Sequence, residues 1–256
     1  MFTLNLDWAP GAAFTYLILF ARIGAMLMLL PALGEDTIPM RLRLAFGLAF
    51  TFVLYPLLSS IMPPMPPDIP GMVALLFHEL AVGLIIGSIV RITTMATQVA
   101  GAVIAFQIGL SGAMSADPTQ QGQQSAVFTS FLSFLGITLI FATDLHHMAL
   151  AAIYDSYDVF SPTMPIMSED AMQLALKTVA SAFSVGVQMS APFIVFGLVF
   201  NLGAGILSRL MPALQVYFIL MPANILAGLV LFALLLMMMM GWYLSAFENH
   251  LAMWRG

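Results

Sequence analysis

Long runs of apolar residues, separated by short polar breaks, dominate the pattern along the chain. Runs of about 20 apolar residues are typical of helices that cross the ~30 Å hydrocarbon core of a membrane. The pattern therefore predicts an all-α fold of membrane-derived, hydrophobic helical hairpins. The apolar segments lie at about 11–33, 44–62, 71–106, 126–143, 178–208 and 210–247.

Two of these runs are too long for simple membrane spans. As single helices, residues 71–106 and 210–247 would reach about 54 Å and about 57 Å. Proline lacks an N–H group and clashes with the preceding turn, so Pro212 and Pro222 are expected to break the second run, and Pro192 the run before it. Backbone freed at such breaks must be covered by protein. We therefore expect long, bent or broken helices packed on partner subunits, not six ordinary spans.

A stripe of small and polar residues follows one face of the 71–106 segment. At 100° per residue its members fall within a sector of about 120°: Glu79, Gly83, Gly87, Arg91, Thr94, Gln98, Gly101 and Ala105. Glycine lets backbones approach closely, and polar groups in an apolar medium need partners. The stripe packs either within this chain or against other subunits, and we expect the second.

The most acidic stretch, residues 154–177, interrupts the apolar pattern. Two prolines, Pro162 and Pro165, break helices there. Ser168 followed by two acidic residues is typical of a helix N-terminus. We expect an exposed excursion that carries a short helix.

Composition narrows the class of protein. Of the 256 residues, 61% are hydrophobic and 7% are charged, against about 25% charged in soluble domains. The mean hydropathy of +1.02 agrees with an integral membrane or membrane-derived protein. Seven scattered Lys and Arg residues and a net charge of −5 exclude a nucleic-acid surface. Without cysteine there is no disulfide, thiol nucleophile or Cys-ligated metal.

One neutral polar stretch, residues 107–125, separates two apolar runs. Glycines and a proline interrupt helical continuity there, and Asp117 is the only ionisable group. The stretch is either a solvated connector or a flap that covers or lines something, and its apolar first half favours the flap. The candidate residues are Gln107, Gly109, Leu110, Ser111, Gly112, Ala113, Met114, Ser115, Asp117 and Pro118.

Two fragments resemble membrane-protease signatures, but each lacks a residue that the protease chemistry requires. The His78–Glu79 pair begins like a zinc-binding H-E-x-x-H motif, but Val82 replaces the second histidine. The fragment Gly109-Leu-Ser-Gly112 resembles a rhomboid-type serine site, which needs a histidine base within the membrane. The remaining histidines lie at segment ends: His146, His147 and His250. We predict no catalytic, cofactor or metal site, and interpret His146 and His147 as interfacial or structural.

Three ionisable residues, Arg22, Glu79 and Arg91, lie inside apolar segments. Such residues are functional hypotheses by default, and a small multi-pass secondary transporter is one explanation for them. An ion pair between Glu79 and Arg22 that holds two helices in register explains them equally well. No convincing internal repeat supports the transporter.

Three ordered motifs resemble a known family over essentially the whole chain. The first is Pro31…Gly34-x-x-x-x-Pro39-x-Arg41-x-Arg43. The second is Glu79-x-x-x-Gly83-x-x-x-Gly87, followed by Ala100-Gly101 and the Gln107-Ile-Gly109…Asp117-Pro118 loop. The third is Asn201-x-x-x-Gly205-Ile-Leu-Ser-Arg209-x-x-Pro212, with Pro222 and Gly228 beyond it. In order and spacing they resemble the FliR/SctT family of type III secretion export-gate proteins. Relatives often carry Pro-Gln-x-Asn where this chain has Pro212-Ala-Leu-Gln215.

The resemblance implies a non-enzymatic export-gate subunit without cofactors, in the bacterial inner membrane at the flagellar basal body. It favours the flagellar over the injectisome branch. The implied partners are FliP-like and FliQ-like subunits, a FlhB-like subunit and exported unfolded polypeptides. Residues 107–125 would plug the closed channel. The expected structural or assembly residues are Arg22, Arg41, Arg43, Glu79, Gly83, Gly87, Arg91, Gly101, Asn201, Gly205, Arg209, Pro212 and Pro222.

Overall fold

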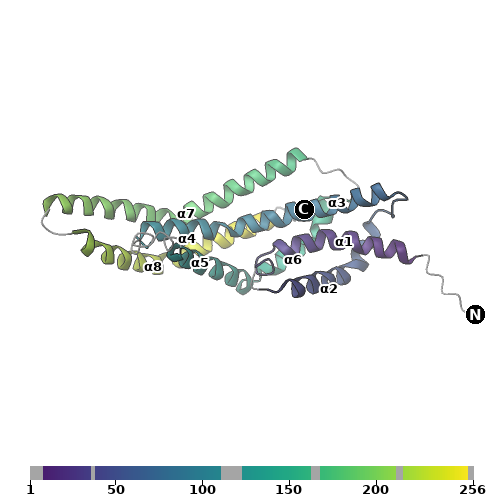
Figure 1. Cartoon of the computed structure of the whole chain (residues 1–256), viewed down its shortest axis with the longest axis horizontal. Helices are drawn as coiled ribbons and strands as arrows, with labels where there is room; N and C mark the ends of the chain where they lie inside the picture. Colours follow the sequence, from purple (N-terminus) through teal and green to yellow (C-terminus); the bar gives the residue numbers. More distant parts are fainter. Residues whose placement is uncertain (1–7, 36–37, 111–122, 163–167, 212–215, 253–256) are drawn as a thin grey trace, which may run out of the picture. The chain divides into compact units, whose positions relative to one another are not determined.

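The computed structural model of the chain describes residues 8–35, 38–110, 123–162, 168–211 and 216–252. Within these residues the regular structure is helical and no strand occurs, which confirms the predicted all-α fold. The elements in chain order are α1 (Ala9–Leu29), α2 (Met40–Leu58), the short 3₁₀ helix η1 (Ser59–Ile61), α3 (Ile69–Thr94), α4 (Ala96–Gln107), α5 (Gln123–Ala142), α6 (Leu145–Val159), α7 (Ser168–Leu210) and α8 (Val216–Ala252) (Figure 1).

Five helical segments in the described part of the chain are long and apolar enough to cross a membrane. The count rises to six if α5 and α6, a bent pair with a short break between them, form one span. As straight helices, α7 and α8 would reach about 65 Å and about 56 Å, so each is much longer than a hydrocarbon core of about 30 Å. The expectation of overlong and broken helices is thus confirmed.

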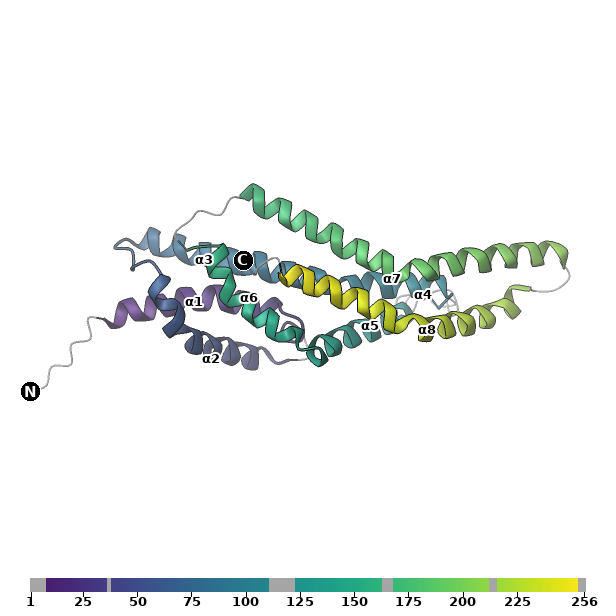
Figure 2. The same ribbon diagram turned by 180° about the vertical axis from the view of Figure 1, so that it is seen from behind.

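The first of two compact units combines Met1–Ile92, Asp144–Thr178 and Asn249–Gly256. Its core is the apolar face of α1, where Ile18, Leu19, Ile23, Met26 and Leu27 are buried at helical spacing. Helix α2 lies beside α1 in both views (Figures 1 and 2). The glycines of α3 face α1 from another side, and a buried arginine of α1 reaches α6.

The second unit combines Thr93–Thr143 and Val179–Glu248, and therefore holds α4, α5, most of α7 and most of α8. Helix α8 runs beside α5 in both views (Figures 1 and 2). Two contacts explain this neighbourhood. The rings of Phe128 and Phe232 meet edge to face with centroids 4.6 Å apart. At Gly136 of α5, an added Cβ would lie 3.0 Å from the Tyr243 ring.

The glycines of the small-and-polar stripe pack inside the chain. A Cβ added at Gly83 would lie 2.9 Å from the Ala25 side chain, and one at Gly87 would lie 2.9 Å from Leu29, both on α1. A Cβ at Gly101 would lie 2.7 Å from the backbone of α5. These glycines already have close neighbours in their own chain, so the expectation that they pack against other subunits is wrong.

Two prolines do not break helices as expected. Pro192 lies within α7, which has 43 residues, and Pro222 lies within α8, which has 37. A proline removes one helical hydrogen bond, whereas ending a helix frees several backbone groups that an apolar medium cannot satisfy. Pro212 lies outside the described residues.

The acidic stretch also departs from expectation. Helix α6 continues through its acidic residues to Val159. The capping signal at Ser168 does mark a helix start, but α7 then continues to Leu210. The expectation of a short isolated helix is therefore wrong, because nothing after Ser168 stops a helix before the long apolar run begins.

Candidate functional site

The end of α4 fixes how the chain enters the neutral stretch. Gly109 has a φ of +81°, in the left-handed region. Its N–H donates to the Phe106 carbonyl at 3.1 Å, and the Leu110 N–H donates to the Ala105 carbonyl at 3.0 Å. This pair of bonds around a left-handed glycine is the Schellman motif that ends many helices. The first turn beyond α4 is therefore defined by Gly109.

Three residues of α7 and α8 hold this capped helix end. An added Cβ at Gly197 would meet the Gln107 side chain, and one at Gly228 would meet Ile108. The Asn224 side-chain amide donates to the Gln107 carbonyl at 3.4 Å. We call residues 107–110, together with Gly197, Asn224 and Gly228, the loop anchor. It contains no charged side chain.

The sequence of α8 explains why it presents the anchor. Asn224, Gly228, Phe232, Met239 and Tyr243 recur at spacings of four or seven residues and are all buried. They therefore lie on one helix face, directed at the core of the second unit. Gly228 leaves room for the Ile108 side chain. The Asn224 amide donates to the Gln107 carbonyl, one of the carbonyls that the end of α4 leaves without a helical partner.

Replacing Gly228 by alanine is expected to destabilise the protein by about 1–3 kcal/mol, because the new methyl group overlaps Ile108. The matched control is Gly241→Ala in the same helix. Gly241 has nothing within 4 Å, so this change should be neutral or stabilise the helix by up to about 1 kcal/mol. Thermal melting of both variants in detergent checks the opposite signs. Equal melting temperatures would contradict the tight contact.

The structure describes only some of the predicted loop residues. Gln107 is the last residue of α4, and Gly109 and Leu110 belong to its capping turn. The rest of the candidate set, Ser111, Gly112, Ala113, Met114, Ser115, Asp117 and Pro118, lies outside the described residues. Helix α5 begins at Gln123, before the predicted loop end at 125.

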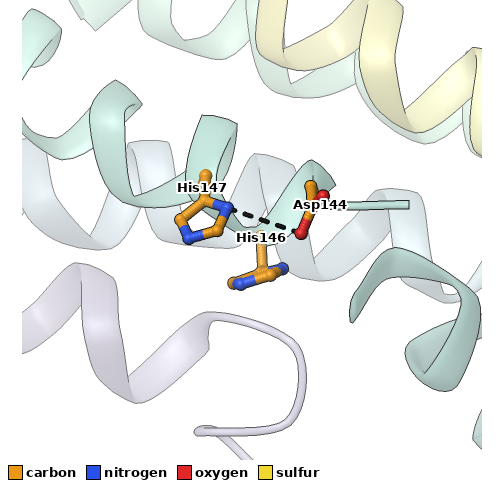
Figure 3. Close-up of side chains that lie close together, drawn as sticks. All are labelled: Asp144, His146 and His147. Carbon is orange, nitrogen blue, oxygen red and sulfur yellow. Dashed lines mark ion pairs between the residues drawn. The ribbon is translucent and has the colours of Figure 1, made fainter. Parts of the chain in front are cut away.

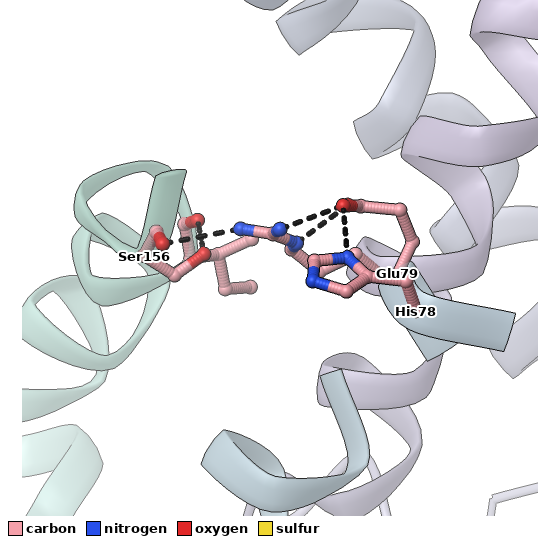
Figure 4. Close-up of polar contacts among 5 residues, drawn as sticks. His78, Glu79 and Ser156 are labelled. Atoms are coloured by element: carbon pink, nitrogen blue, oxygen red, sulfur yellow. Dashed lines mark hydrogen bonds and ion pairs between the residues drawn. The ribbon is translucent and has the colours of Figure 1, made fainter. Parts of the chain in front are cut away.

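A buried charged cluster ties three helices of the first unit together (Figure 4). Arg22 of α1 and Glu79 of α3 are fully buried and make two contacts, Nε–Oε2 at 2.6 Å and Nη2–Oε1 at 2.8 Å. Arg22 Nη1 also donates to the Ser156 carbonyl of α6 at 3.1 Å, and the guanidinium lies 4.1 Å from the centroid of the Tyr157 ring. His78 Nδ1 lies 3.2 Å from the same carboxylate. The ion pair offered as one explanation of these residues is therefore present.

The remaining predicted residues lie apart from this cluster. Arg91 pairs with Glu35 at 2.6 Å, and both side chains are partly exposed. Arg41 and Arg43 lie in the first turn of α2, exposed and half-buried respectively. The face of α7 that carries Asn201, Gly205 and Arg209 is exposed, as is Pro222 of α8.

A second polar cluster lies where α6 begins (Figure 3). Asp144 precedes the helix with a left-handed φ of 59°. Its Oδ1 lies 3.7 Å from His147 Nδ1, and the rings of His146 and His147 have centroids 4.0 Å apart. One ligand atom from each of the three residues can be chosen so that all lie within 4.8 Å of one another.

Sequence reasoning missed several of these residues. Asn224 could have been found, because it is a lone amide in an apolar run, four residues before a glycine. Gly197 gave no signal beyond its small size. Glu35 was not singled out, and Ser156 contributes its backbone carbonyl, which no sequence motif reveals.

Residues 13–250 match the model of a family described as bacterial export proteins, family 1. The flagellar biosynthetic protein FliR of Caulobacter vibrioides is 45% identical over 217 residues, covering 85% of this chain and 86% of the relative. FliR of Bacillus subtilis is 29% identical over 213 residues, covering 82% and 81%. The Yop proteins translocation protein T of Yersinia pestis is 24% identical over 229 residues, covering 88% and 87%.

Proposed function

This chain belongs to family 1 of the bacterial export proteins, and we propose that within the flagellar type III export apparatus it helps to form and plug the channel for exported polypeptides. Its role in protein export rests on the 45% identity to a flagellar biosynthetic protein over most of both chains. Its proposed action is non-enzymatic: the chain shapes a passage and closes it at rest.

The loop anchor is the observation that best supports the proposed plug. A plug must be held at its base and must not attract ions or passing polypeptide through fixed charge. Residues 107–110 are capped and held by α7 and α8 without a charged group. The stretch that follows, residues 111–122, has Asp117 as its only ionisable residue. A fixed base with a small-residue continuation that carries a single ionisable group suits a displaceable seal.

The transporter explanation is not favoured. A proton or ion relay needs an acid that can release its partner during transport. Glu79 is fully buried and bound through both oxygens by Arg22. Arg91 has its own carboxylate partner in Glu35. The three residues on which a transporter would rest are thus accounted for by ion pairs: Arg22–Glu79 joins α1 to α3, and Arg91–Glu35 joins α3 to the turn between α1 and α2.

Protein partners fit the exposed C-terminal part of α7. Gly203 and Gly205 have nothing within 4 Å, and neighbouring Leu202, Ile206 and Leu210 are exposed. Because α7 is longer than a hydrocarbon core, lipid alone does not cover this surface. We propose FliP-like and FliQ-like subunits, and a FlhB-like subunit, as partners of this chain in the bacterial inner membrane at the flagellar basal body.

Purification of the tagged chain from native membranes in mild detergent, followed by mass measurement of the intact particle, tests the assignment. An export-gate subunit should co-purify in a stable complex of several different membrane proteins. Recovery only as a monomer or homodimer would overturn the proposal.

Reversing the charge at Arg209 is expected to reduce assembly strongly. Arg209 lies in the last turn of α7 and is exposed in the chain itself. Within this chain, Arg209→Glu should cost about 1 kcal/mol or less, through the unfavourable helix dipole. Recovery of the complex should fall strongly while the melting temperature of the isolated chain changes little. Lys177→Glu, also exposed on α7, is the matched control. Normal complex yield from Arg209→Glu would refute a contact between Arg209 and a partner subunit.

A further inference from the structure

The start of α6 gathers the side chains of a metal-binding group. Asp144, His146 and His147 supply one carboxylate and two imidazoles, and Figure 3 shows all three on the same side of the helix start. Their chosen ligand atoms lie within 4.8 Å of one another. Around an ion bound at 2.0–2.2 Å, neighbouring ligand atoms are about 3.3 Å apart. Binding one ion therefore requires these ligand atoms to come closer together by up to about 1.5 Å.

The local backbone makes this gathering possible. Asp144 is one of two described non-glycine residues with positive φ, the other being Ala32. Such a conformation carries a steric cost for a residue with a Cβ atom. Here it accompanies a carboxylate directed toward His147, with Oδ1 3.7 Å from Nδ1. The side chains of Asp144 and His147 are 79% and 71% exposed, so neighbouring packing does not prevent them from closing on an ion.

The donor set selects the class of ion. Two imidazoles and a carboxylate suit zinc, nickel and copper, whereas magnesium and calcium prefer oxygen ligands. One carboxylate balances half of the charge of a divalent ion. Three protein ligands leave at least one position for water. We infer that Asp144, His146 and His147 bind one divalent transition-metal ion at the start of α6, a site distinct from the loop anchor and independent of the proposed export function.

Metal binding by the full chain tests this inference directly. The chain is purified with an affinity tag that contains no histidine, stripped with a chelator, and dialysed against Zn²⁺ before the bound metal is measured. We expect about one zinc ion per chain. Because removing even an outer-shell partner of a metal site costs about 10–100-fold in affinity, Asp144→Asn and His147→Gln should each weaken binding by about tenfold or more.

Matched controls separate this site from adventitious binding. Asp158→Asn changes another exposed carboxylate of α6, and His78→Gln changes a histidine of α3; both should keep the metal. With Cu²⁺ as the probe, the electron paramagnetic resonance spectrum should show coupling to two nitrogen ligands, and to one after His147→Gln. Zinc binding that is equal in the wild type and His147→Gln, or that falls equally in the controls, would overturn the inference.

Discussion

Deleting Leu110 to Asp117 is expected to leave the chain folded and assembled but to make the membrane leak ions and small solutes. The deletion removes eight of the 19 residues of the stretch 107–125 and keeps the other parts of the loop anchor, including Gln107, Gly109 and Asn224. If that stretch seals the resting channel, its loss should open a passage for ions and small solutes, because the proposal includes no second seal. Conductance of membranes that contain the assembled complex, measured before and after the deletion, gives the answer.

Replacing the same eight residues by an equally long Gly/Ser segment is the informative control. It keeps the length of the stretch but removes the apolar side chains of Leu110 and Met114. An intermediate leak would show that those side chains contribute to the seal. A deletion mutant that assembles correctly and shows unchanged conductance would rule out the plug while leaving the family assignment intact.

Breaking the buried ion pair is expected to have the largest effect on stability. Arg22→Met leaves the Glu79 carboxylate buried without its main partner, and Glu79→Gln leaves the guanidinium buried without its counter-charge. Removing one member of a buried pair costs about 3–5 kcal/mol. Each single variant should therefore melt at a much lower temperature than the wild type in detergent, or fail to accumulate.

The double variant Arg22→Met/Glu79→Met distinguishes the cost of an unpaired charge from loss of packing. With both charges replaced by flexible apolar side chains, much of the lost stability should return. Arg91→Gln provides the matched control, since its pair with Glu35 has the same 2.6 Å separation but is partly exposed; such pairs contribute about 1 kcal/mol or less. A double variant whose loss of stability equals the sum of the losses in Arg22→Met alone and Glu79→Met alone would contradict energetic coupling of the pair.

How far the sequence predicts this fold depends on the kind of signal. Charges inside apolar segments are the most informative, because an unpaired charge is so costly there that Arg22 and Glu79 had to find a partner. The partner of Arg91 was not predictable, since Glu35 lies in a turn where an acidic residue is ordinarily solvated. Sustained apolar character is a second reliable signal, and the apolar runs therefore locate most helices, α7 and α8 included despite their internal prolines.

Glycine and proline gave less certain information. The glycines of α3 correctly indicated a close helix neighbour, but a glycine does not specify which helix that is, and α1 of the same chain is the answer. The prolines were expected to end helices, with the freed backbone groups covered by protein. In α7 and α8 the apolar surroundings make one missing hydrogen bond cheaper than a helix end.

Only part of the loop anchor was predictable, because a sequence pattern does not identify which distant helices contact a given residue. Gly109 carried a clear signal, because a glycine after an apolar helical run favours a helix end. The residues that hold it come from more than 80 positions later in the chain, Gly197 and Asn224 among them. Contacts between distant segments depend on how helices pair, and periodicity within one segment does not contain that information.

The open face around Gly203 and Gly205 has a consequence for how the cell makes this protein. A copy that is synthesised without anything to cover that face carries exposed apolar residues along a helix too long for the bilayer to shelter. Quality-control proteases recognise such surfaces, and aggregation competes with them. Surplus copies should therefore be short-lived, so that the amount of this chain in the cell is set by how many assembly sites await it and not by how fast it is translated.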